Sequence, residues 1–146
     1  MIRPIREQDR EFYLKAANNF YQSDAVLSPI PFQHIINTFD LLMAGTPFAK
    51  AYILEKDNLP CGYALLAETW SQEAGGAVIW IEELYVLPEY RGHGLGHEFF
   101  SFLEKTYQNH AKRFRLEVED ENEGAVRLYK RMNFDFFPYK QMKKEF

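Results

Sequence analysis

Residues 84–96 read Leu-Tyr-Val-Leu-Pro-Glu-Tyr-Arg-Gly-His-Gly-Leu-Gly. An apolar run ends at a proline, and three alternating glycines lead into a pattern that places apolar side chains on one helix face to about residue 109. Glycine lets a backbone approach a ligand closely, and a helix N-terminus offers unpaired N–H groups and a partial positive charge. With Arg91 as a further cation, this stretch predicts an anion-binding turn that suits a pyrophosphate.

Two other phosphate-binding motifs do not fit this turn. A P-loop needs Gly-Lys-Ser/Thr, whereas Gly96 is followed by His97 and Glu98. A dinucleotide-binding turn that starts at Gly94 needs a small residue where Phe99 stands, together with an opening βαβ unit. The remaining alternative is a turn that only connects a strand to a helix.

The chain before this turn predicts two helices and four strands. Apolar periodicity and breaker residues place helices over 6–21 and 32–44, separated by the loop 23–31. Strands are expected over 2–5, 48–55, 62–70 and 77–86, the last so apolar that it suits a central strand buried on both faces.

The chain after the turn predicts a strand over 113–119, in which Phe114, Leu116 and Val118 alternate with charged residues. Asn122 suits the N-cap of a helix over 123–132, and short strands are expected over 134–137 and 139–143. The order indicates a mixed α/β fold, a mostly antiparallel central sheet flanked by helices, in a single domain over 1–146.

The composition is that of an ordinary globular protein of 146 residues, with a net charge of −4 that argues against nucleic acid as a partner. Cys61 is the only cysteine, so it forms no disulfide within the chain, and His93 and His97 lack the carboxylate pattern of a metal site. The N-terminus has no leader pattern and no apolar run is long enough to cross a membrane. We therefore expect a cytoplasmic protein without a metal.

The motif Arg91-Gly92-His93-Gly94-Leu95-Gly96 resembles the Arg/Gln-x-x-Gly-x-Gly/Ala motif of the GNAT acetyltransferase superfamily. The resemblance covers nearly the whole chain, through Ile2-Arg3-Pro4, the stretch 84–90, Asn122 and Leu128-Tyr129. It implies a GNAT fold with acetyl-CoA as cosubstrate, and it departs from the family pattern at Asn133, where a glycine is usual. The residues that it assigns to coenzyme A are Leu84, Tyr85 and Val86 beside the pantetheine arm, Arg91, Gly92, His93, Gly94, Leu95, Gly96 and His97 around the pyrophosphate, and Asn122, Ala125 and Tyr129 near the pantetheine.

Acetyl transfer needs a proton acceptor, because most amines are protonated at neutral pH, and a donor for the departing thiolate. Glu82 and Glu83, both candidates for the base, end the most apolar strand, and alternation places one on each side of the sheet. The resemblance favours Glu82 as base, because polyamine-acetylating relatives have a glutamate nine residues before the motif arginine. It also admits Glu117, which relatives that acetylate N-terminal amines place twelve residues before the catalytic tyrosine. The alternative for each is a solvent-facing residue.

By the same resemblance, Tyr129 is the general acid, although a helical tyrosine is more often part of the core. The sequence is thus interpreted as an N-acetyltransferase that transfers an acetyl group directly from acetyl-CoA to a primary amine of a small molecule. A covalent route through Cys61 has no activating neighbour in sequence. The acceptor is expected between the loop 23–31 and the turn 71–76, lined by some of Phe32, Trp70, Trp80 and Tyr85.

Two alternatives stay open. One is a non-catalytic acyl-CoA-binding sensor, which would need neither Tyr129 nor a carboxylate in the site. The other is a protein N-terminus or lysine as acceptor. A set of acidic residues near the expected site favours a cationic small molecule as acceptor: Glu68, Glu73, Glu119, Asp120, Glu121 and Glu123. The resemblance also admits a homodimer.

Overall fold

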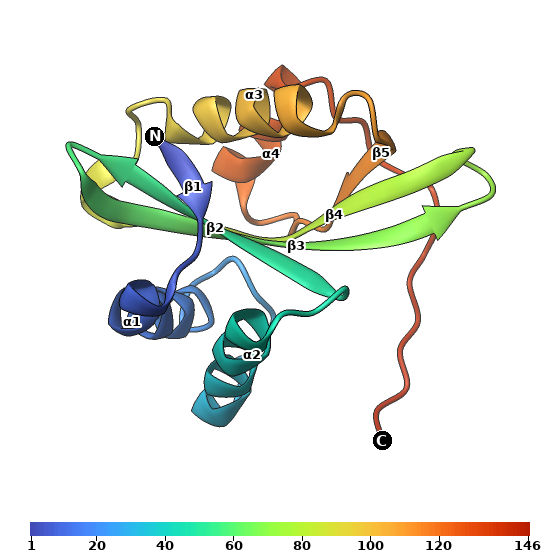
Figure 1. Cartoon of the computed structure of the whole chain (residues 1–146). Helices are drawn as coiled ribbons and strands as arrows, with labels where there is room; N and C mark the ends of the chain where they lie inside the picture. The colour runs from blue at the N-terminus through green and yellow to red at the C-terminus, as the bar shows by residue number, and fades with distance from the viewer.

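An open sheet of five strands separates the helices into two layers in the computed structural model, which describes residues 1–146 (Figure 1). The strands lie in chain order, β1-β2-β3-β4-β5. The first three pairs are antiparallel and only β4 and β5 run parallel. The strand bounds are β1 (Ile2–Pro4), β2 (Ala49–Lys56), β3 (Leu59–Ser71), β4 (Gly76–Val86) and β5 (Ala111–Leu116). The mixed α/β prediction is confirmed.

The helices cover opposite faces of this sheet (Figure 1). On one face lie α1 (Arg10–Phe20) and α2 (Phe32–Ala44), whose buried residues pack with Tyr63 and Tyr85. On the other face lie α3 (Leu95–Tyr107) and α4 (Glu123–Arg131), and α3 buries Phe99 and Leu103 against the sheet. Short 3-10 helices precede α1 (Glu7–Asp9) and α3 (Pro88–Tyr90). No helix is both long and apolar enough to cross a membrane.

Strands β4 and β5 part before β4 ends. Their pairing runs from Ala77 and Ala111 to Ile81 and Leu116, and no pair follows. Strand β4 continues to Val86 against β3 alone. The edge of β4 that would face β5 is therefore without a strand partner from residue 82 onward. Backbone groups on this edge that make no other hydrogen bond can bond a ligand.

A β-bulge lies at this point of separation. Leu65 pairs with Glu83 and Leu66 with Ile81, so Glu82 is the extra residue on β4. Such a residue is not held to one face by the regular alternation of side chains. The bulge lets the Glu82 side chain enter the space between the strands.

The two predicted C-terminal strands, 134–137 and 139–143, were wrong, because residues 134–146 form no strand. We call residues 134–146 the C-terminal segment. It is anchored by side chains instead: the Phe134 ring lies 5.4 Å from that of Phe100, and Tyr139 donates to Glu73. Pro138 has no N–H to give to a sheet, and β5 is an edge strand. The strand predicted over 113–119 also ends earlier, at Leu116.

Candidate active site

The turn before α3 has the backbone that its glycines predict. Gly92 and Gly94 have φ of 76° and 81°, in the left-handed region that glycine adopts without strain, and Gly94 is the N-cap of α3. The first bond of the helix runs from the Glu98 amide to the Gly94 carbonyl at 2.9 Å. The amides of residues 95–97 thus have no acceptor within the helix. This geometry fits a pyrophosphate.

The side chains of Arg91 and His93 contact backbone carbonyls at or near the turn itself. Arg91 Nε donates to the Val86 carbonyl at 2.9 Å, and its guanidinium lies 5.5 Å from the centre of the Tyr85 ring. In this arrangement Arg91 stabilises its own turn. His93 Nδ1 lies 3.2 Å from the Tyr90 carbonyl, while His97 is exposed on the first turn of α3.

Helix α4 is pressed against the start of α3. A Cβ on Gly96 would lie only 2.6 Å from Leu128 Cδ2, so a larger residue at position 96 would make the Leu128 side chain shift. Asn122 caps α4, as predicted, because its Oδ1 accepts the Ala125 amide at 3.3 Å. These two contacts fix Tyr129, one residue beyond Leu128, relative to the turn.

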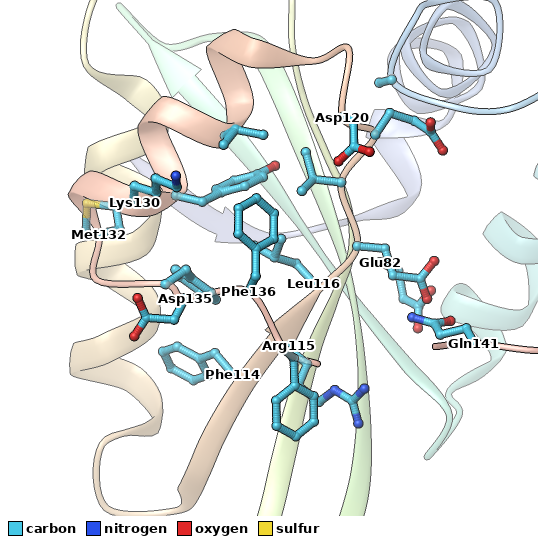
Figure 2. Close-up of a pocket in the computed structure, with 18 of the residues that line it drawn as sticks. Glu82, Phe114, Arg115, Leu116, Asp120, Lys130, Met132, Asp135, Phe136 and Gln141 are labelled. Carbon is cyan, nitrogen blue, oxygen red and sulfur yellow. The ribbon is translucent and has the colours of Figure 1, made fainter. Parts of the chain in front are cut away.

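A cleft of about 970 Å³ opens where β4 and β5 separate. It brings together Glu82 from β4, Glu117 from beyond β5 and Tyr129 from α4, three of the four predicted catalytic residues. In Figure 2 the labelled Glu82 side chain projects from its strand beside the C-terminal segment. The unpaired edge of β4 begins at Glu82, and Leu84, two residues further along it, is not part of the cleft lining.

The family model for the acetyltransferase (GNAT) family matches residues 8–134. The chain belongs to the GNAT acetyltransferase family. It is therefore an acyl-CoA-dependent acetyltransferase, and the family uses acetyl-CoA.

Curated relatives and solved structures agree with this assignment. Thialysine N-epsilon-acetyltransferase from Sus scrofa is 30% identical over 135 residues, covering 89% of this chain and 72% of that enzyme. The enzyme of the same name from Mus musculus is 36% identical over 77 residues, which cover 50% of this chain and 43% of that enzyme.

Among structures, a possible acetyltransferase from Clostridium difficile 630 has a TM-score of 0.84 at 21% identity, over 100% of this chain and 97% of that one. An aminoglycoside N-acetyltransferase in complex with CoA has a TM-score of 0.80 at 13% identity, over 99% and 93%. At such identities these likenesses show the GNAT fold.

In this acetyltransferase the environment of Glu82 favours a proton acceptor. Burial among the cleft walls raises the pKa of Glu82, and the charge of Glu117 raises that pKa further. The carboxylate nevertheless stays reachable, because the side chain is exposed within the open cleft. A raised pKa makes a carboxylate a stronger base.

Glu83 lies on the other face of the sheet and does not line the cleft. Its carboxylate is buried and accepts hydrogen bonds from the hydroxyls of Tyr21 and Tyr63, the latter at 2.6 Å. Burial raises the pKa of Glu83, and the two tyrosine hydrogen bonds partly oppose that shift. Tyr21 itself lines the cleft, so Glu83 holds a residue of the cleft wall in position.

Tyr129 packs its ring edge-on against Phe100, with 5.7 Å between the ring centres. Burial raises the pKa of Tyr129 above its ordinary value of 10.0. The phenol is thus protonated at neutral pH and able to donate.

The cleft is not lined by the residues expected around the acceptor, Phe32, Trp70, Trp80 and Tyr85. Trp70 is 79% exposed, and Tyr85 is buried against α1. The loop 23–31 does contribute, through residues 25–28. The other walls come from residues that the sequence did not single out: Arg113, Arg115, Phe136, Phe137, Tyr139 and Gln141.

Proposed function

We propose that this acetyltransferase transfers an acetyl group from acetyl-CoA to a primary amine of a small molecule, with Glu82 as base and Tyr129 as acid. The observation that supports it most is the meeting of Glu82 and Tyr129 at one cleft, at the point where β4 loses its pairing with β5. Both substrates would bind together and transfer would be direct.

The residues around the cleft suit acetyl-CoA, which supplies the activated acetyl group as a thioester. Backbone amides of residues 92–97 would hold the pyrophosphate, since the glycine turn and helix start expose them. Residues 84–86 would pair with the pantetheine arm as a strand would, because that edge of β4 has no partner. The side-chain oxygen of Asn122, Oδ1, already caps α4, so a contact with the pantetheine would be made by its side-chain nitrogen, Nδ2.

Glu82 would take the proton of the attacking amine, and Tyr129 would give a proton to the departing sulfur. Glu117 then helps Glu82, because a nearby negative charge favours the protonated form that results. Cys61 has no part in this scheme. It is fully buried, its thiol donates to the Leu54 carbonyl, and burial raises its pKa.

A small cationic acceptor suits the charge of the cleft. Its lining has twice as many acidic as basic residues: Glu82, Glu104, Glu117, Glu119, Asp120 and Asp135 against Arg113, Arg115 and Lys130. The relatives' name supports this class, since thialysine is a small amine. A cytoplasmic location, a homodimer and the absence of nucleic acid and membrane partners stay predictions.

The test is thiol release from acetyl-CoA with a panel of polyamines, aminoglycosides, amino acids and short peptides. We expect release with one class of small amine, and a large loss of kcat in Tyr129→Phe with unchanged coenzyme A affinity by calorimetry. Tyr90→Phe, a tyrosine outside the cleft, is the matched control. Tight acetyl-CoA binding without release would favour the sensor, and release with peptides alone would favour a protein acceptor.

A further inference from the structure

The cleft carries a cation that the proposed chemistry does not use. Arg115 lines it from β5, at the position paired with Trp80 of the neighbouring strand. Its neighbour Arg113 is already neutralised by Glu73, at 2.9 Å. Arg115, by contrast, forms no ion pair, because no carboxylate oxygen lies within 4.0 Å of its guanidinium nitrogens.

Two aromatic rings hold the Arg115 guanidinium in place. Its central carbon lies 4.2 Å from the centre of the Trp80 ring and 4.8 Å from that of Phe137. Ring contacts use the face of a guanidinium, while a carboxylate binds its edge through two parallel N–H groups. Because the rings restrict the side chain beforehand, a carboxylate ligand meets a donor pair that loses little entropy on binding.

The spacing relates this cation to the base. Glu82 follows Trp80, the pairing partner of Arg115, by two residues on β4, and two strand residues span about 6.6 Å. Figure 2 shows Glu82 and Arg115 extending from neighbouring strands toward the same side of the cleft. An acceptor that meets both must separate its amine from its negative group by several bonds.

We propose that the acceptor is an amino acid with a terminal amine, whose carboxylate binds Arg115 while the terminal amine is acetylated at Glu82. This inference rests on the proposed function. A polyamine would place a second ammonium near an unpaired guanidinium, which is unfavourable. A protein lysine has no free carboxylate for Arg115. An aminoglycoside lacks one as well.

The test compares lysine with lysinamide, in which an uncharged amide replaces the carboxylate. For the wild type we expect kcat/KM for lysine to exceed that for lysinamide by about 10- to 100-fold, the worth of a charged hydrogen-bonded pair. In Arg115→Gln this preference should fall to about threefold or less, while lysinamide turnover is retained. Mass spectrometry should place the acetyl group on the side-chain amine.

Controls separate the two proposals. Arg127→Gln removes an exposed arginine of α4 and should keep the preference. 2,3-Diaminopropionate, whose side-chain amine is too close to its carboxylate, should react poorly with the wild type. Any of three results would overturn the role of Arg115. They are equal kcat/KM of the wild type for lysine and lysinamide, a preference of the wild type for polyamines, and an equal loss of kcat/KM for both substrates in Arg115→Gln. Absence of turnover with every amine would instead refute the proposed function.

Discussion

The pair Glu82→Gln and Glu117→Gln should distinguish the base from its electrostatic helper. Both carboxylates line the cleft, and the charge of Glu117 contributes to the raised pKa of Glu82. Glutamine keeps the size of each side chain and removes only its charge and basicity. If Glu82 takes the proton, the two substitutions have different effects on rate and on pH dependence.

We expect Glu82→Gln to lower kcat by about 10²- to 10⁴-fold, the usual contribution of a general base. Glu117→Gln should lower kcat by no more than about tenfold, or about 1.4 kcal/mol. The sign of its pH effect follows from the charge. Removing Glu117 removes a cause that raises the pKa of Glu82, so activity should persist to lower pH than in the wild type. Burial, the larger cause of the raised pKa, remains. The acidic limb of the pH profile of kcat should therefore move only part of the way toward the pKa of an ordinary glutamate.

The assay is kcat at saturating amine and acetyl-CoA from pH 5 to 9, because kcat reports groups in the ternary complex. The amine's own titration is common to the three proteins, so differences between profiles belong to the enzyme. Calorimetry with coenzyme A checks that each variant keeps its fold. The reasoning fails if Glu117→Gln abolishes turnover while Glu82→Gln retains it, or if the acidic limb moves to higher pH in Glu117→Gln.

Four other substitutions, at three positions, test the supports of the cleft. Glu83→Ala leaves the hydroxyls of Tyr21 and Tyr63 without their acceptor and should reduce the free energy of unfolding, measured by urea, by about 2–4 kcal/mol. Because the folded pKa of Glu83 is raised above 4.5, its ionisation opposes folding, so the stability of Glu83→Gln relative to wild type should increase as pH rises through that pKa. Gly94→Ala forces alanine into φ of 81° with free space around its Cβ, so we expect a purely conformational loss of about 1–2 kcal/mol, with weaker coenzyme A binding by calorimetry. Asn122→Ala should cost about 1 kcal/mol in urea denaturation and lower kcat, since the cap holds the helix that carries the acid.

Much of the fold was predictable because its signals are local. The glycine turn, the helix that follows it and the Asn122 cap each depend on residues within one or two turns of chain. Alternation in β5 placed Phe114 and Leu116 toward α3 and Arg115 on the other face, as expected from a period of two. The C-terminal strands failed because strand formation needs a partner backbone, which a local pattern does not supply.

The candidate site, too, was predictable from the sequence only in part. The glutamates, the tyrosine and the phosphate-binding turn could be named from the sequence by spacing and family resemblance. What could not be predicted was the bulge in β4 at Glu82, because a bulge is a property of the register between two strands. Arg115 could not be singled out from the sequence, because the two rings that contact its guanidinium come from distant segments, Trp80 from β4 and Phe137 from the C-terminal segment. Local sequence determined the elements and the coenzyme turn, whereas contacts between distant segments determined which charges face the cleft, because only tertiary packing sets register and burial.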